Sequence, residues 1–154
     1  MDSEELEKTI LERPLPSRVL LRSRNLKFLL EGVGAAFRIF VLLPFRRVET
    51  FHPPAPPGAV READLEWAAI SHALAEKLLR SPWFPFRRTC LRRSLLLAHL
   101  LRKSGIEVSI CFGVSRGEGD LRGHSWLAVD GTPFLENEES WRGYTCVFTL
   151  PRAD

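Results

Sequence analysis

The stretch RRTCLRRSLLLAHLLRKSG, residues 87–105, predicts a helix that begins with a thiol. The helix is expected to start at Thr89 or Cys90, and Gly105 is typical of the residue just after a helix end. The positive end of a helix dipole and nearby cations stabilise a thiolate. Four arginines supply such cations, namely Arg87, Arg88, Arg92 and Arg93. Cys90 is therefore a candidate nucleophile, and its unpaired backbone N–H could hold an oxyanion. The alternative is a buried apolar thiol beside a solvated basic face.

After this helix, the spacing of the apolar residues changes from that of a helix to that of a strand. In GIEVSICFGVS, residues 105–115, apolar and other residues alternate, which predicts a half-buried strand. GHSWLAVDG, 123–131, reads as a second strand that ends in an Asp-Gly turn. TPFLE, 132–136, would return beside it, and GYTCVFTL, 143–150, would be the last strand. We predict an α+β fold in which one cysteine-bearing helix packs on three to four antiparallel strands.

The first half of the chain is helical in pattern. One helix is expected over about 17–43 with Ser17 as N-cap, and a second over about 60–80. In the second, Trp67, Ile70, Leu74 and Leu78 form an apolar stripe. The proline-rich FHPPAPPGA, 51–59, separates the two helices. We therefore divide the chain into a helical region, 1–82, and a second region, 83–154, that contains Cys90, the two packed as one compact unit.

A thiol nucleophile needs a base, and the chain offers four histidines: His52, His72, His99 and His124. His52 lies in the proline-rich connector, and His72 lies off the apolar stripe of its helix. His99 is on the same helix as Cys90 but too far along its axis to reach the thiol. His124 begins the second strand and could meet the helix start. His124 is therefore the candidate base, against the alternative of a structural histidine.

A third group must orient the base, and three residues are candidates. Asp130 lies at the far end of the His124 strand. In a hairpin with its turn at 130–131, Glu136 or Asn137 returns close to His124. The geometry prefers Glu136, then Asn137, over Asp130.

Three further residues are predicted to bind substrate: Trp83, Arg93 and Trp126. Both tryptophans could equally belong to the core, and Trp83 could wall a groove next to Cys90. Cys111 and Cys146 alternate with apolar residues and are expected to be structural thiols.

The composition of the chain argues against several classes of protein. The chain has 154 residues, the length of one ordinary domain, with 22 basic against 19 acidic residues, a net charge of +3. That charge is too small to predict nucleic-acid binding. Three cysteines without a C-x-x-C pair argue against a zinc site. An acidic N-terminus argues against a secretory signal, and the apolar stretch 26–45 carries Lys27, Glu31 and Arg38, so membrane insertion is not expected. A cytoplasmic setting with free thiols is expected.

The motifs TCLRRSLLLAHLLRKSGIEVSICFGVSR, 89–116, and GHSWLAVDG, 123–131, resemble the lasso-peptide leader peptidases. These are the protease half of a split maturation enzyme and belong to the transglutaminase-like, papain-related superfamily. The helical half with LLPFRR, 42–47, is also similar. The resemblance covers nearly the whole chain and is firmest from about 80 to 136.

The resemblance implies that Cys90 is the nucleophile and His124 the general base. Glu136 stands where the family usually has Asp, Ser125 replaces Ala, Ala128 replaces Glu, and Arg92 stands where proline is common. The implied activity is removal of the leader from a ribosomally synthesised precursor peptide, without cofactor or metal. A separate leader-recognition protein and an ATP-dependent macrocyclase are the implied partners. The resemblance also implies that region 1–82 docks the partner or the leader and that region 83–154 is catalytic. A transglutaminase-like acyltransferase and an inactive peptide-binding module are the alternatives.

Overall fold

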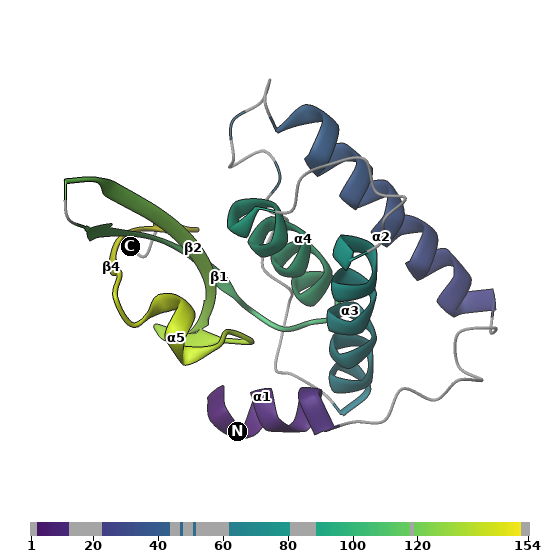
Figure 1. Ribbon diagram of the computed structural model, residues 1–154. Coiled ribbons are helices and arrows are strands. Elements are labelled where there is room, and N and C mark those ends of the chain that lie inside the picture. Colours follow the sequence, from purple (N-terminus) through teal and green to yellow (C-terminus); the bar gives the residue numbers. More distant parts are fainter. Residues whose placement is uncertain are drawn as a thin grey trace.

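In the part of the chain that the structure describes, four helices and a short fifth pack with one sheet. The computed structural model describes residues 3–12, 23–43, 47, 51, 62–80, 89–117 and 119–151. The helices are α1 (Ser3–Glu12), α2 (Ser23–Leu42), α3 (Glu62–Arg80), α4 (Cys90–Lys103) and α5 (Glu138–Trp141), and the strands are β1 (Ser109–Arg116), β2 (Leu121–Val129), β3 (Thr132–Phe134) and β4 (Thr145–Leu150). Figure 1 shows α2, α3 and α4 gathered on one side of the sheet. The predicted α+β fold is confirmed.

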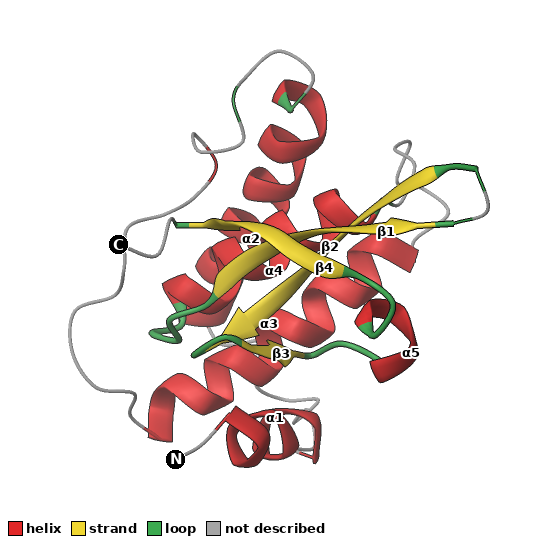
Figure 2. Cartoon of the chain, turned by 90° about the vertical axis from the view of Figure 1, so that its left-hand side faces the viewer, coloured by secondary structure: helices red, strands yellow, loops and turns green. Residues whose placement is uncertain are grey.

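The four strands form one antiparallel sheet in the order β3-β2-β1-β4. The turn between β2 and β3 consists of Asp130 and Gly131, whose φ angles are 48° and 80°. Two successive positive φ angles characterise a tight hairpin turn, for which Asp-Gly is a favoured sequence. The predicted hairpin is thus confirmed. In Figure 2 the sheet lies in front of the helices, so the molecule has a helical layer behind a β layer.

Helix α4 lies at the centre of the core because its leucines contact both layers. Five of them are almost completely buried: Leu95, Leu96, Leu97, Leu100 and Leu101. They belong to one cluster with Ile39 and Phe40 of α2 and with Ile110 and Leu127 of the sheet. The helix ends as expected, because Gly105 follows it with a φ of 91°. A rigid central helix therefore fixes the position of Cys90 at its start.

The apolar stripe predicted on α3 is only partly right, because Ile70 is buried but most of the buried face lies on another side of the helix. The buried side chains are Leu65, Ala68, Ala69, Ile70, Ser71, Ala75 and Leu79. Trp67, Leu74 and Leu78 are only partly buried. Small residues face the core here because α3 packs closely on α4, where Ser71 and Ser104 share a buried hydrogen bond of 2.9 Å. The first helix of the prediction begins at Ser23 in the structure, and Ser17 lies outside the described residues.

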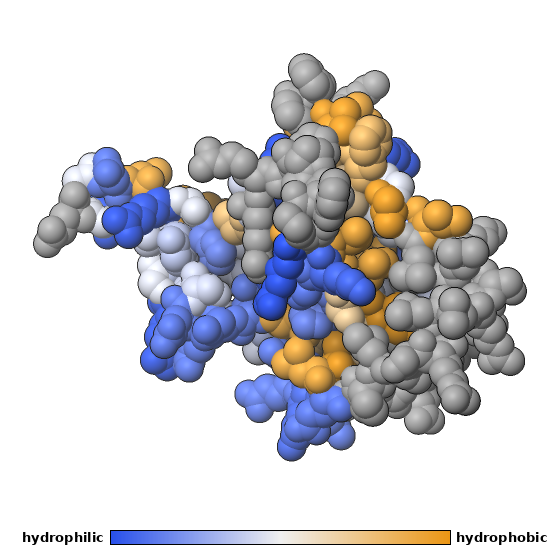
Figure 3. All heavy atoms as spheres, turned by 45° about the vertical axis from the view of Figure 1, so that its right-hand side comes forward, coloured by the Kyte–Doolittle hydropathy of each residue, from blue (hydrophilic) through white to orange (hydrophobic). Residues whose placement is uncertain are grey.

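Helix α2 exposes part of its apolar surface. Leu30, Val33 and Phe37 are 64%, 44% and 61% exposed and follow each other at spacings of three and four. Figure 3 brings this side of the molecule forward and shows hydrophobic residues gathered on it. Among the described helices, none has the length and apolar character needed to cross a bilayer.

Candidate active site

Cys90 is the first residue of α4, and its neighbours fix the start of that helix. The hydroxyl of Thr89 accepts a hydrogen bond from the Arg92 N–H at 3.3 Å, and the Thr89 carbonyl accepts one from the Arg93 N–H at 3.0 Å. Thr89 is thus the N-cap, a position that threonine favours. The N–H of Cys90 has no acceptor within its own helix, as is general for the first turn of a helix. The thiol itself is half-buried.

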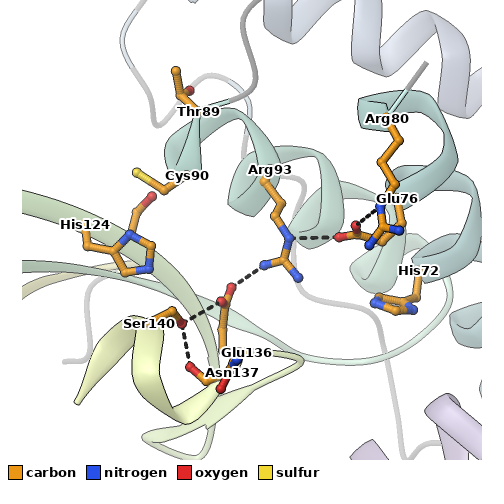
Figure 4. A pocket seen from close by; sticks show the side chains of 11 residues that line it. His72, Glu76, Arg80, Thr89, Cys90, Arg93, His124, Glu136, Asn137 and Ser140 are labelled. Carbon is orange, nitrogen blue, oxygen red and sulfur yellow. Dashed lines mark hydrogen bonds and ion pairs between the residues drawn. The ribbon is translucent and has the colours of Figure 1, made fainter. Parts of the chain in front are cut away.

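The position of His124 follows from a buried contact between α4 and β2. Ser94 lies one turn after Cys90, on the same side of α4. Its hydroxyl donates to the carbonyl of Ser125 at 3.0 Å, and Ser125 follows His124 in β2. Cys90 and His124 line one cavity of about 550 Å³. Figure 4 shows the His124 ring below the Cys90 side chain.

The surroundings of His124 favour its neutral imidazole over the protonated form. Its ring centroid lies 5.9 Å from that of Trp126 and 5.2 Å from that of Tyr144. Burial, and to a lesser degree the charge of Arg93, hold the pKa of His124 below the ordinary histidine value. Its Nε2 is buried and has no hydrogen-bond partner in the described part of the chain. A neutral imidazole next to a thiol can act as a general base.

Glu136 lines the same cavity, but it is held by other residues than His124. One carboxylate oxygen pairs with the Arg93 guanidinium, and the other accepts a long hydrogen bond of 3.4 Å from Ser140. Burial raises the pKa of Glu136 even though Arg93 opposes the shift. Among the described residues no hydrogen bond joins Glu136 to His124. The carboxylate therefore shares the cavity with the histidine without being bonded to it.

Arg93 connects three elements around the cavity. Its Nε donates to Glu76 of α3 at 2.9 Å, one terminal nitrogen pairs with Glu136, and the other donates to the Leu135 carbonyl at 2.9 Å. Leu135 has a φ of 55°, a conformation that few non-glycine residues adopt. These contacts use three of the about five N–H groups of a guanidinium, and Arg93, which the sequence predicted to bind substrate, lines the cavity. Figure 4 shows it between the two carboxylates.

Three polar side chains of α3 complete the cavity wall; from the sequence, His72 is set aside as a base, and Glu76 and Arg80 are not predicted. His72, Glu76 and Arg80 recur every fourth residue and therefore lie on one side of the helix. Arg80 pairs with Glu76 at 3.5 Å. Burial lowers the pKa of His72, which makes it a second neutral imidazole at the site. The recurrence of polar residues every four positions was the signal that could have found them.

Of the other predicted site residues, Trp126 is 4% exposed and packs with Cys111 and Ala128. It does not line the cavity, so its indole supports the His124 ring instead of reaching a substrate. Asp130 lies in the exposed hairpin turn and does not line the cavity either. Asn137 does line it, but its side chain caps α5 by accepting from the Glu139 N–H at 3.3 Å. Several predicted residues lie outside the described part of the chain: His52, Trp83, Arg87 and Arg88.

The two remaining thiols differ from each other. Burial and a hydrogen bond with Cys146 raise the pKa of Cys111 to about 12, as expected of a structural thiol. Cys146 is exposed, although its strand was expected to bury it. Within the described residues, no group of three or more His, Cys, Asp or Glu side chains could hold a metal ion.

A comparison with protein families gives one match. Residues 29–149 match the family described as "Transglutaminase-like superfamily". The matched range runs from α2 to β4 and includes Cys90, His124 and Glu136. A search of curated proteins found no match, and neither did a search of solved structures.

Proposed function

The chain belongs to the transglutaminase-like superfamily, and from that membership we propose that it is a cysteine peptidase. The observation that carries the proposal is that Cys90, at a helix start, and the neutral His124 line one cavity. Superfamily members generally use a cysteine, a histidine and an aspartate. A thiol beside an imidazole is the arrangement that nucleophilic catalysis requires.

The proposed reaction begins when His124 takes the proton from the Cys90 thiol. The thiolate attacks the scissile carbonyl, and the N–H of Cys90, in the first turn of α4, donates to the oxyanion. His124 then gives its proton to the leaving amine, the C–N bond breaks, and a thioester remains on Cys90. Water, deprotonated by His124, attacks the thioester and releases the acid and the thiol.

Glu136 is proposed to orient the His124 ring through its unpartnered Nε2. The oxygen of Glu136 that accepts from Ser140 at 3.4 Å is only weakly held, because hydrogen bonds of this length lie beyond the usual range. A small rotation of the Glu136 side chain on substrate binding would free this oxygen to accept from the His124 imidazole. Arg93 would keep the other oxygen in place during that movement.

The substrate that we propose is a precursor peptide from which the leader is removed. The support is the resemblance of residues 89–131 to the lasso-peptide leader peptidases, and the superfamily match is compatible with it. The same resemblance implies a separate leader-recognition protein and a macrocyclase that acts afterwards. An ordinary peptide amide would then be the bond that is hydrolysed.

The test is a mass-spectrometric cleavage assay with a candidate precursor peptide, with and without a candidate leader-recognition protein. A single cut that gains the mass of one water and is lost in Cys90→Ala and His124→Ala would support the proposal. Full cleavage by Cys90→Ala would overturn it. Transfer of the acyl group to an added amine in place of water would favour the acyltransferase alternative.

The exposed apolar side chains of α2 are a proposed contact for the leader-recognition protein. Apolar side chains at spacings of three and four suit a protein interface more than contact with water. Phe37→Asp is expected to lower partner-dependent cleavage, while Leu11→Asp on α1, which is 55% exposed, serves as control. Equal cleavage by the two variants would remove α2 from the proposal.

A further inference from the structure

A second cavity, of about 300 Å³, opens on the other side of Cys90 and His124. It shares these two residues and Ser125 with the polar cavity. The rest of its lining is apolar or glycine: Leu91, Phe112, Gly113, Val114, Gly123 and Val147. The thiol therefore lies between a wall rich in charged groups and a wall of hydrocarbon. A peptide with its carbonyl at Cys90 would extend into both cavities.

The register of the sheet explains how this apolar wall arises. Val114 of β1 pairs with Gly123 of β2, and Phe112 pairs with Ser125. Paired residues of antiparallel strands point to the same face, so these four share the face that α4 covers farther along. Toward their turn the two strands extend beyond the helices, as Figure 1 shows. The sheet thus continues past the start of α4.

A β-bulge in β4 forms part of the rim of the cavity. Phe112 pairs with Phe148, but the next residue, Gly113, pairs with Cys146, so Val147 is the additional residue of a bulge. Val147 is 62% exposed and lines the cavity. An exposed valine at the mouth of an apolar cavity, beside a candidate nucleophile, suits contact with a ligand.

Gly123 lines the cavity and leaves open space where a side chain would lie. A Cβ built on Gly123 meets no heavy atom within 4 Å, and its φ is not in the left-handed region. The backbone therefore does not require glycine at this position. A side chain there would project on the face shared with Val114, into the apolar cavity.

We propose that this cavity binds an apolar side chain, aliphatic or aromatic, of a substrate residue that flanks the scissile bond. Gly123 is then a specificity-determining residue, because its missing side chain leaves the space. The inference rests on the proposed function and names the chemical class of its substrate. Apolar surface gains most from burial where the wall offers few polar groups.

The test measures alkylation of Cys90 by two reagents in the full-length protein. N-hexylmaleimide and N-methylmaleimide carry the same reactive group, and their rates at Cys90 are read by site-resolved mass spectrometry and normalised to free cysteine. Partial burial of the hexyl chain is expected to make the normalised ratio of the two rates about ten or higher. A ratio near one would overturn the proposal.

Two variants locate the effect. Gly123→Leu fills the space and is expected to lower the hexyl-to-methyl ratio toward one. Val147→Ser changes only an exposed rim residue and is expected to lower the same ratio severalfold, which keeps the test valid if Gly123→Leu does not fold. Gly34→Leu is the matched control, because a Cβ at this exposed helical glycine also meets nothing within 4 Å. A ratio in Gly123→Leu and Val147→Ser as high as in Gly34→Leu would overturn the proposal.

The labelling assay does not depend on peptide cleavage. A high ratio that falls in both variants, together with no cleavage of any precursor, would retain the apolar site and reject the peptidase. Cleavage that needs Cys90, together with a hexyl-to-methyl rate ratio near one, would retain the peptidase and reject the apolar site.

Discussion

Arg93 is ion-paired with Glu136, the carboxylate that the sequence assigns to His124. The pair links the start of α4 to the segment after β3, and Arg93 also contacts Glu76 of α3. One cation therefore holds two carboxylates at the wall of the cavity that contains Cys90. Its charge acts on the histidine as well, because it contributes to the lowered pKa of His124.

Replacing Arg93 by methionine is expected to raise the pKa of His124. The guanidinium disfavours the imidazolium, so its removal takes away one cause of the lowered pKa while burial remains. Protonated His124 cannot accept the thiol proton. The acid limb of the rate against pH should therefore move to higher pH, with kcat reduced about tenfold. NMR titration of the His124 ring reports the pKa without an activity assay.

Arg80→Met is the control for that shift. Arg80 lines the same cavity and pairs with Glu76, but its charge is not among the causes of the His124 shift. Its removal should leave the His124 titration in place. An unchanged titration in Arg93→Met, or an equal change in both variants, would contradict the electrostatic role.

Replacing Glu136 by glutamine tests the third member of the site. The amide keeps the size of the side chain but cannot stabilise an imidazolium, so kcat should fall about 10- to 100-fold with little change in KM. Asp130→Asn is the matched control, because asparagine also tolerates the positive φ of this turn residue. Kinetics in which Asp130→Asn loses as much as Glu136→Gln would reject the assignment.

Gly113→Ala is expected to disturb the aromatic support of His124. A Cβ at Gly113 would lie 2.4 Å from two atoms of the Trp126 indole and 3.1 Å from the Cβ of Tyr144. Both rings flank the imidazole, so kcat should decrease, and overpacking should cost about 1–3 kcal/mol of unfolding free energy. Thermal unfolding and turnover measure the two effects.

Gly143→Ala provides the comparison, because a Cβ at Gly143 meets nothing within 4 Å. It should retain both stability and turnover. If Gly113→Ala behaved like Gly143→Ala, the indole would not be fixed against this strand.

The C-terminal half could be predicted from sequence because its signals are local. The start of α4, the glycine after it and the Asp-Gly turn each depend on a few neighbouring residues, and these set the register that returns Glu136 toward His124. The position of Glu136 followed from counting residues along one hairpin. Its partner did not, because the contact with Arg93 joins residues 43 positions apart.

The error in the predicted inner face of α3 explains why two polar residues of the cavity were not predicted. The predicted inner face consisted of Trp67, Ile70, Leu74 and Leu78, of which only Ile70 is buried. It placed His72, Glu76 and Arg80 on the outer side of the helix. The buried face combines Leu65, Ile70 and Leu79 with three alanines and Ser71, whose small side chains allow α3 to pack closely on α4. Hydrophobic size was therefore a poor guide on this helix, and the regular spacing of its polar residues was the better one.

Cys111 is expected to resist alkylation in the folded protein even at pH 9. Only the thiolate reacts, and with a pKa of about 12 about one thousandth of the Cys111 thiol is ionised at that pH. Burial at 6% exposure limits access further. Iodoacetamide followed by site-resolved mass spectrometry should label Cys90 and the exposed Cys146 first, and Cys111 only after denaturation. Labelling of Cys111 at the rate of Cys146 in the native protein would mean that β1 and β4 separate readily, and the apolar cavity between β1 and α4 would then have no fixed wall.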